Sequence, residues 1–145
     1  MINTIWIVIL AGLMFLRANL PEAVSENPTW DEMIYFLNQD HTNWNEYVDG
    51  DYTCRHFACD VCKAALQQEL RCAFVHVNFR YFAHAAVAFE TTDQGLIYFE
   101  PQADRRVKIE VGHEYWSWTV GLIVESTHLY WNDDLTFEIA CIKQE

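Results

Sequence analysis

Hydrophobic residues recur at helical spacing in two stretches of the chain. Between residues 30 and 37 the apolar positions are 30, 33, 34 and 37, so a short helix is predicted there. From Cys54 to about Leu70 the apolar positions are 57, 58, 61, 62, 65, 66 and 70. This one-sided pattern is the clearest helix signal in the sequence. The residues between the two stretches, 38–51, are rich in Asn, Asp and Gly and are predicted to form a polar loop.

After residue 71 the pattern changes to short apolar runs that are typical of strands. The runs span residues 72–79, 85–90, 96–99, 107–111, 121–125 and 136–142. The turn residues Asp93-Gln94-Gly95 separate the second run from the third, so these two are expected to pair as an antiparallel hairpin. Helices followed by a series of strands predict an α+β fold, with a helix packed on an antiparallel sheet.

The N-terminus carries an uninterrupted apolar run of its own, from Ile5 to Leu16, which ends at Arg17. A membrane-spanning helix needs about 20 such residues, so the run favours a signal peptide, although no Lys or Arg precedes it and no clean cleavage site follows. A buried N-terminal helix is the alternative. We interpret residues 1–24 as a hydrophobic leader, a signal peptide or anchor with a linker, and residues 25–145 as the domain. A secreted or membrane-tethered, extracytoplasmic protein is expected, and a cytoplasmic location remains open.

Composition narrows the classes of partner. The chain has 145 residues, of which 52% are hydrophobic, which is enough for one domain with a single core. Its formal net charge is -12, and it contains only nine Lys and Arg residues. Nucleic-acid binding depends on clustered positive charge, so a nucleic-acid partner is not expected.

The five cysteines form an odd set: Cys54, Cys59, Cys62, Cys72 and Cys141. An exported domain could pair four of them and keep one free thiol, whereas a cytosolic protein could keep all five reduced. The pair Cys59 and Cys62 has the spacing of a redox or zinc motif, but a zinc site needs about four ligands and no second pair exists. Core packing in the second helix is the better interpretation for both residues. A disulfide from one of them to Cys72 is an open alternative.

Three residues have the chemistry of a nucleophile, a base and an orienting acid. Cys54 lies where the second helix begins, and a helix N-terminus with a neighbouring imidazole favours the reactive thiolate. If the 85–90 and 96–99 runs pair, His84 at the start of one lies near Glu100 at the end of the other, since paired strands are only ~4.8 Å apart. Packing the helix on this hairpin could then bring Cys54 to His84.

The motifs around these residues resemble the transglutaminase-like superfamily of papain-like thiol enzymes. In that family a helix opens with Cys and an aromatic-Ala pair, a later strand begins with His-Ala, and the next strand ends in an acid followed by Pro. The corresponding residues here are Cys54-Arg55-His56-Phe57-Ala58, His84-Ala85 and Glu100-Pro101. The resemblance covers roughly residues 50–112, and it implies a papain-like core in which the nucleophile helix packs on an antiparallel sheet.

The sequence departs from the family pattern at three points. Glu100 stands where most members have Asp, Ala86 stands where Trp is usual, and no Trp precedes Cys54. A carboxylate with one more methylene can still orient an imidazole, so the triad is retained in principle. These departures favour a hydrolytic or an unassigned activity over protein cross-linking.

The resemblance implies a role for each residue. Cys54 would attack a carbonyl, His84 would take and return a proton, and Glu100 would orient His84. The Cys54 backbone N–H is a candidate oxyanion donor, and Asn43 and Asn45 are candidates for a second one. A protein or peptide substrate is expected, with no metal and no organic cofactor. The alternative is a non-catalytic binding or accessory domain that retains the fold and is tethered to a membrane through residues 5–16.

Two further histidines are expected to lie outside this triad. His56 follows Cys54 by two residues and therefore projects elsewhere on the helix, so we expect it at the surface or at a pocket rim. His76 alternates with Val75 and Val77 along its strand and should face the side opposite to them.

Overall fold

The computed structural model describes residues 25–115 and 121–142. The expected leader, residues 1–24, lies outside these described residues. No helix in the described part is both long and apolar enough to cross a membrane. The elements are α2 (Trp30–Gln39), the 3₁₀ helix η1 (Thr42–Trp44), α3 (Cys54–Gln67), β1 (Ala73–Asn78), β2 (Ala83–Thr91), β3 (Gly95–Glu100), β4 (Arg105–Val107), β5 (Ser126–Trp131) and α4 (Leu135–Ile142).

The five strands form one antiparallel sheet in the order β4-β3-β2-β1-β5. The predicted hairpin is present, because β2 pairs with β3 from Thr91 opposite Gly95 to Val87 opposite Phe99. Gly95 adopts a φ of 74°, a left-handed conformation that suits glycine at the end of this turn. The α+β architecture expected from the order of elements is therefore confirmed.

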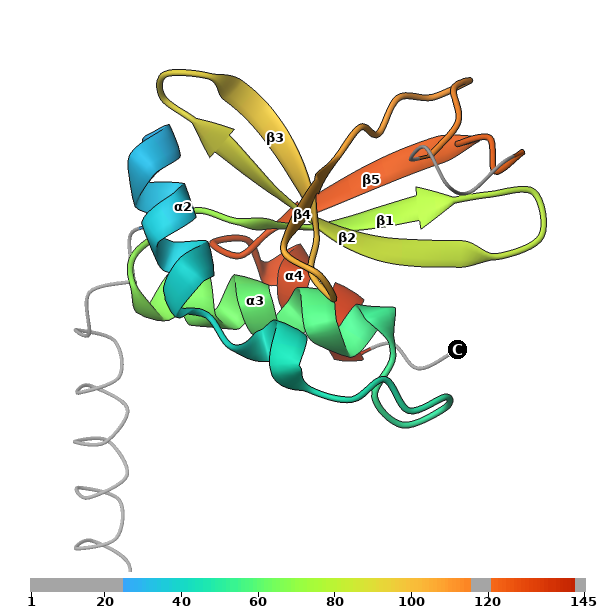
Figure 1. The fold of residues 1–145 in the computed structure, drawn as a ribbon, viewed down its shortest axis with the longest axis horizontal. Helices are drawn as coiled ribbons and strands as arrows, with labels where there is room; N and C mark the ends of the chain where they lie inside the picture. The colour runs from blue at the N-terminus through green and yellow to red at the C-terminus, as the bar shows by residue number, and fades with distance from the viewer. Residues whose placement is uncertain (1–24, 116–120, 143–145) are drawn as a thin grey trace, which may run out of the picture.

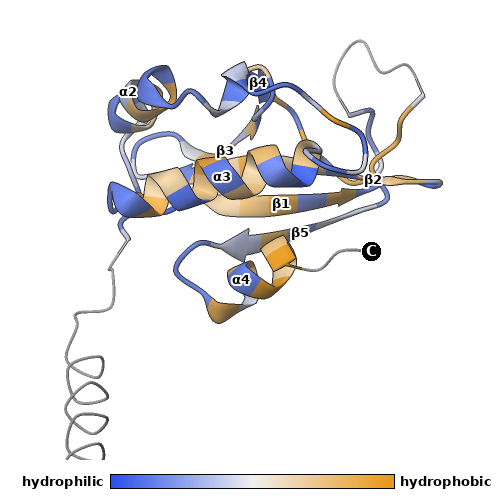
Figure 2. Cartoon of the chain, turned by 90° about the horizontal axis from the view of Figure 1, so that it is seen from below, coloured by the Kyte–Doolittle hydropathy of each residue, from blue (hydrophilic) through white to orange (hydrophobic). Residues whose placement is uncertain are grey.

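The helices cover one face of this sheet (Figure 1). On that face, side chains of α2 and α3 pack with inward residues of the strands, among them Phe74 and Val87, in one buried cluster. The opposite face buries a second cluster, in which Val75 and Val77 of β1 contact residues of the loop that follows β4, including Tyr115. β1 thus has apolar contacts on both sides, and Figure 2 shows it as largely hydrophobic while α3 is mixed.

The sequence of α3 explains why the helix begins at Cys54. Thr53 is the N-cap residue in extended conformation, and its backbone N–H donates to Nδ1 of His56 at 3.1 Å. This pairing replaces the Glu of an ordinary capping box with His. The buried residues of the helix include the small side chains Ala58 and Ala65, which let the helix backbone lie close to the sheet.

The loop before α3 is anchored to the helix by one tyrosine. The Tyr52 hydroxyl donates to the Asp60 carboxylate at 2.7 Å and accepts from the Asn45 side chain at 2.9 Å. Its ring contacts Phe57 edge-on, with the centroids 4.7 Å apart. Burial, followed by the hydrogen bond to Asp60, raises the pKa of Tyr52 to about 12, so this hydroxyl stays a donor at any physiological pH.

The prediction of a strand at residues 136–142 is wrong, because these residues form α4. Apolar residues at 137, 139 and 141 alternate as they would in a strand, and this pattern masks a helix start. Asp134 provides that start: its carboxylate accepts the Thr136 N–H at 2.9 Å, and its carbonyl accepts the Phe137 N–H at 3.0 Å. Asp is one of the residues preferred at the N-cap of a helix, because its short side chain can accept a backbone N–H of the first turn.

The edge strands also differ from the prediction. The strand expected at 107–111 lies earlier, at Arg105–Val107, and the run 121–125 contributes an isolated bridge from Ile123 to Glu114. Ser126–Trp131, which was not predicted, pairs with β1 along six residues. Both edge strands carry mostly exposed or half-buried side chains, so neither shows the apolar alternation of a central strand.

One disulfide joins helix α3 to helix α4. Cys59 of α3 is bonded to Cys141 of α4 across 82 residues, so the expected alternative of a bond from Cys59 to Cys72 is wrong. Cys62 and Cys72 are free thiols that are fully buried, with their sulfur atoms 3.1 Å apart. Burial and the neighbouring Cys62 raise the pKa of Cys72, so this thiol stays protonated. Cys54 is the one free cysteine of the described chain that is not buried.

Loss of the Cys59–Cys141 bond should destabilise the domain. Because the bond closes a long loop, we expect Cys59→Ser to lower the free energy of unfolding by about 2–4 kcal/mol in urea denaturation. Cys141→Ser should have a similar effect, and the double variant should add little to it. Cys54→Ser is the matched control, because it keeps the disulfide. A reductant should lower the stability of this variant by as much as it lowers the stability of wild type. A wild-type protein whose unfolding midpoint does not move with reductant would contradict the bond.

Candidate active site

The structure brings His84 and Glu100 into direct contact. His84 is the second residue of β2 and Glu100 is the last residue of β3, so the hairpin places them side by side. The His84 ring nitrogen Nε2 lies 2.7 Å from Glu100 Oε2. Glu100 is 5% exposed, and a buried carboxylate requires a charged or hydrogen-bonded partner. The contact predicted from the hairpin is therefore present.

A second donor, Tyr115, holds the same carboxylate. Its hydroxyl donates to Glu100 Oε2 at 2.8 Å, so this one oxygen receives both Tyr115 and His84. Glu100 Oε1 is also buried and has no hydrogen-bond partner among the described residues. The Tyr115 ring lies edge-on to the His84 ring, with centroids 5.5 Å apart. Tyr115 thus fixes the orientation of both groups.

Burial also keeps Tyr115 in its hydroxyl form. Loss of solvent, followed by the charge of Glu100 and the hydrogen bond to it, raises the pKa of Tyr115 well above its usual range. A neutral hydroxyl can donate to a carboxylate, whereas a phenolate could not. The arrangement therefore leaves the negative charge on Glu100.

Cys54 lies at the first position of α3 and lines the same pocket as His84. Burial alone would raise the pKa of the Cys54 thiol, but a side-chain hydrogen bond with His84 and the charge of that ring lower it overall. Backbone N–H groups of Ala85 and Arg55 also lower this pKa, because they donate to the sulfur. The local environment therefore favours the thiolate.

The histidine is shifted in the complementary direction. Burial alone would lower the pKa of His84, but its hydrogen bonds to Cys54 and Glu100 and the negative charge of both raise it to about 9. Glu100 engages Nε2, so Nδ1 is the ring nitrogen left for the thiol. A lowered thiol pKa beside a raised imidazole pKa favours the charged thiolate–imidazolium pair over the neutral pair.

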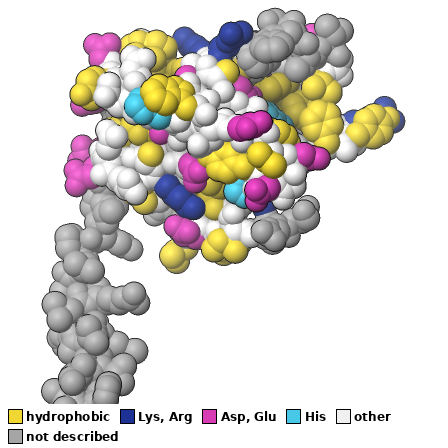
Figure 3. Space-filling view, turned by 60° about the horizontal axis from the view of Figure 1, so that its bottom comes forward, with side chains coloured by type: hydrophobic (Ala, Val, Ile, Leu, Met, Phe, Trp, Pro, Cys, Tyr) yellow, Lys and Arg dark blue, Asp and Glu magenta, His cyan; other side chains and the backbone are white. Residues whose placement is uncertain are grey.

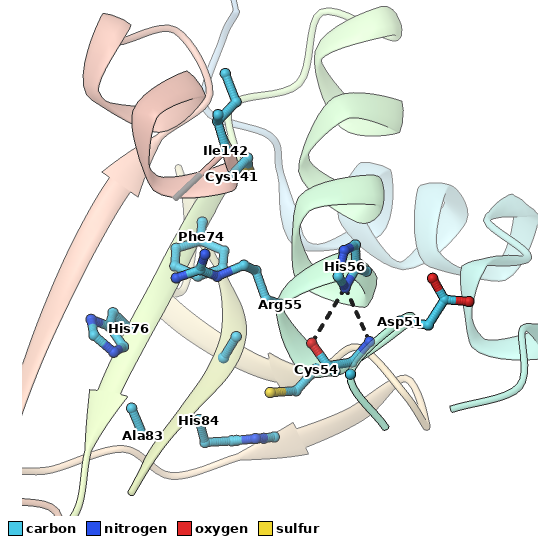
Figure 4. Close-up of a pocket in the computed structure, with 13 residues that line it drawn as sticks. Asp51, Cys54, Arg55, His56, Phe74, His76, Ala83, His84, Cys141 and Ile142 are labelled. Atoms are coloured by element: carbon cyan, nitrogen blue, oxygen red, sulfur yellow. Dashed lines mark hydrogen bonds between the residues drawn. The ribbon is translucent and has the colours of Figure 1, made fainter. Parts of the chain in front are cut away.

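Both residues line an open pocket of about 640 Å³. The pocket extends from the loop at Gly50 and Asp51, past the start of α3, to Cys141 and Ile142 at the end of α4. In Figure 4 the Cys54 sulfur points from the start of α3 toward the strand that carries His84. A substrate in this space would therefore meet the thiol directly.

The other histidines take the places expected of them. His56 lines the pocket, but its Nδ1 accepts a hydrogen bond from the Thr53 backbone N–H. The side chain of His56 therefore caps the start of α3. His76 lines the pocket together with Phe74, whereas Val75 belongs to the cluster on the opposite face of β1. The imidazole that contacts both the thiol and an acid is therefore His84.

The structure does not place the expected second oxyanion donors at the pocket. Asn45 donates to Tyr52 and anchors the loop, and Asn43 has a buried oxygen without a partner in the described part of the chain. Neither residue is among those described as lining the pocket. The Cys54 backbone N–H at the helix start remains the candidate that the geometry allows.

The described residues contain no group of three or more His, Cys, Asp or Glu side chains arranged to hold a metal ion. Cys59 and Cys62, which have the spacing of a metal motif, are instead a disulfide partner and a buried thiol.

Tyr115 is the residue at this site that sequence reasoning missed. It is 3% exposed and lies in a loop, 15 residues after Glu100, where no strand or helix period points to burial. Its place is fixed by the hydrogen bond that its backbone N–H donates to the Leu122 carbonyl at 2.8 Å. An aromatic residue with a polar tip is suited to such a position, but its partner depends on the tertiary fold.

Removing the Tyr115 hydroxyl should measure its bond to Glu100. We expect Tyr115→Phe to lower the free energy of unfolding by about 1.5–3 kcal/mol, the usual range for a hydrogen bond to a charged group. Tyr130→Phe is the control, because no hydrogen bond of the half-buried Tyr130 hydroxyl is described, and it should change stability by less than about 0.5 kcal/mol. Equal unfolding midpoints for the two variants would argue against the bond.

Comparison with known proteins assigns no family. No family model matches the chain, and no curated protein matches it. Among solved structures, one similar chain is described as "PSL1a-E64 complex", with a TM-score of 0.49 and 16% sequence identity. The similarity covers 66% of this chain and 43% of that one, so this chain spans less than half of the other. A likeness of this extent assigns neither family nor activity.

Proposed function

We propose that the protein is a cysteine-dependent hydrolase or acyl transferase that acts on amide bonds through Cys54, His84 and Glu100. The observation that carries the proposal is an imidazole that contacts a buried carboxylate and lines the same open pocket as the Cys54 thiol. The order of the motifs, the helix-on-sheet layout and the thiol at the helix start also fit the transglutaminase-like, papain-like kind of core. We take residues 25–145 as this domain.

The proposed reaction has two steps. In the first, the Cys54 thiolate attacks the amide carbonyl carbon, and the tetrahedral oxyanion forms near the Cys54 backbone N–H. The imidazolium of His84 gives its proton to the departing amine as the C–N bond breaks, which leaves a thioester on Cys54. Glu100 keeps the ring oriented and stabilises its positive charge during the attack.

In the second step a water molecule or an amine attacks the thioester. Neutral His84 takes a proton from this nucleophile, and the thiolate departs, so the enzyme returns to its starting state. Attack by water gives a carboxylic acid and completes a hydrolysis. Attack by an amine gives a new amide and completes an acyl transfer. The open pocket admits either nucleophile, and no metal or organic cofactor takes part in these steps.

The disulfide supports a location for the protein. The Cys59–Cys141 bond fits an oxidising compartment, where disulfides persist. We therefore propose that residues 1–24 act in export or tethering and that the substrate is an extracytoplasmic protein or peptide.

The alternative is a binding or accessory domain that retains the fold without turnover. Its thiol would be an ordinary half-buried cysteine, so the two functions differ in the ionisation of Cys54. A measurement of thiol reactivity therefore separates them.

We expect iodoacetamide to label Cys54 faster than an ordinary cysteine well below pH 8, because its lowered pKa leaves a larger thiolate fraction there. His84→Ala should remove this reactivity at acidic pH, since burial then acts on the thiol without an opposing charge. Each unit by which the thiol pKa rises should reduce the rate about tenfold below that pKa. Peptide mass spectrometry of protein labelled between pH 5 and pH 9 gives the rate for each cysteine.

Two internal references accompany this measurement. Cys62 and Cys72 are fully buried and should label slowly in every variant that stays folded. Glu100→Gln keeps the size of the side chain but removes its charge, and we expect an intermediate labelling profile. Slow labelling of Cys54 that neither substitution changes would reject the enzyme and favour the binding domain.

A further inference from the structure

Arg55, the residue after Cys54, lines the same pocket as the thiol. It is half-buried at the start of α3. In Figure 4 its side chain extends from the helix toward β1, on the same side as the Cys54 sulfur. A guanidinium is permanently charged and carries five N–H donors, so its partners decide what it can bind.

Among the arginines of the described chain, Arg55 is the one whose side chain has no described partner. Arg71 forms ion pairs with Asp133 and Glu90. The guanidinium groups of Arg80 and Arg106 lie over the rings of Tyr81 and Trp30, respectively. Arg105 also has an interaction partner. None of the described ion pairs includes Arg55. Its charge therefore faces the pocket without compensation.

The nearby groups do not neutralise this charge. Asp51 also lines the pocket, but it forms no ion pair with Arg55 within the described structure. Cys54, His84 and Glu100 interact with one another, and none of the described ion pairs joins one of them to Arg55. Arg55 is therefore the one Arg or Lys among the residues that line the pocket, in a protein whose formal net charge is -12. Acidic groups are scattered over the face in Figure 3, with basic groups in separate small patches.

We infer that Arg55 forms a carboxylate-binding subsite beside Cys54, so that the substrate carries a carboxylate close to the bond under attack. This inference rests on the proposed function and specifies its substrate class. The planar guanidinium can hold both oxygens of a carboxylate, which gives orientation as well as attraction. The carboxylate can belong to an acidic side chain or to a peptide C-terminus, since both present the same two oxygens.

The direction of Arg55 places this subsite between the start of α3 and β1. Phe74 and His76 of β1 form the adjacent wall, so the carbon chain that bears the carboxylate would lie against an aromatic ring. Such a subsite selects acyl groups by charge, because an apolar group there would leave the guanidinium desolvated and unpaired.

A pair of alkylating agents tests this subsite without a known substrate. Iodoacetate carries a carboxylate and iodoacetamide is its neutral counterpart, and both transfer their carbon to the Cys54 sulfur with loss of iodide. The ratio of their labelling rates at Cys54 cancels changes in the reactivity of the thiol itself. We expect this ratio to fall about tenfold in Arg55→Gln, the factor that corresponds to the weaker end of charge-assisted hydrogen bonds.

Two further variants sharpen the experiment. Arg55→Lys keeps the charge but loses the planar fork, so its ratio should lie between those of wild type and Arg55→Gln. Arg80→Gln removes an exposed arginine that does not line the pocket, and its ratio should equal that of wild type. Raising the salt concentration should reduce the wild-type ratio more than the Arg55→Gln ratio, because salt screens the attraction.

Protection experiments separate the two sources of carboxylate. N-acetylglutamic acid α-amide offers a side-chain carboxylate, N-acetylglutamine offers an α-carboxylate, and N-acetylglutaminamide is the neutral control. The subsite predicts that one of the two acids slows iodoacetamide labelling of Cys54 more than the neutral compound does, and that Arg55→Gln removes the difference. The acid that protects identifies the source.

The outcomes distinguish this inference from the proposed function. Rapid, His84-dependent iodoacetamide labelling with a rate ratio that Arg55→Gln leaves unchanged would overturn the subsite and leave the thiol chemistry intact. Slow iodoacetamide labelling of wild-type Cys54 would overturn the proposed function, and the substrate class would fall with it.

Discussion

The site depends on the packing of α3 against the helix-facing side of β1 and β2. Cys54 begins the helix and His84 lies near the start of β2, so their separation is set by how closely these elements approach. Ala58 and Ala65 are fully buried at this contact, and their small side chains permit a short distance between helix and sheet. A larger side chain at either position would move the thiol away from the imidazole, because a packed core has little space to absorb it.

The hairpin supplies the second constraint. Antiparallel pairing fixes His84 relative to Glu100, and the loop after β4 adds Tyr115 to the same carboxylate oxygen. The site therefore extends from the half-buried thiol of Cys54, through His84, to the buried carboxylate of Glu100. Charges buried in this way are stable only when each has a partner, so the network is expected to behave as one unit. The Cys59–Cys141 bond acts elsewhere, holding α4 against α3 beside the pocket.

Local signals predicted the parts of the fold that have strong periodicity. The apolar stripe of α3, the β2–β3 hairpin and the contact between His84 and Glu100 all follow from residues close together in sequence or joined by one turn. The edge strand β5 was missed because a partly exposed element carries a weak hydrophobic pattern, and helix α4 was assigned as a strand because its apolar residues alternate. Short segments of this kind take their structure from the neighbours they pack against.

Contacts between residues far apart in the sequence could not be predicted, for a related reason. The bond from Cys59 to Cys141 and the donation from Tyr115 to Glu100 depend on loops whose paths are set by the complete fold. Cysteine counting left several pairings open, and no spacing rule chooses among them. That Arg55 has no partner among the described residues is likewise a tertiary property, since it depends on which of their acidic side chains the fold places near it.

The central claim is that Cys54 and His84 form a thiolate–imidazolium pair, and NMR titration of the His84 ring tests it most directly. The account predicts that His84 titrates with a pKa of about 9 in wild type and with a lower pKa in Cys54→Ala, because the thiolate contributes to the shift. Comparison with His84→Gln assigns the signal. A His84 that titrates near 6.5 in both proteins would contradict the account.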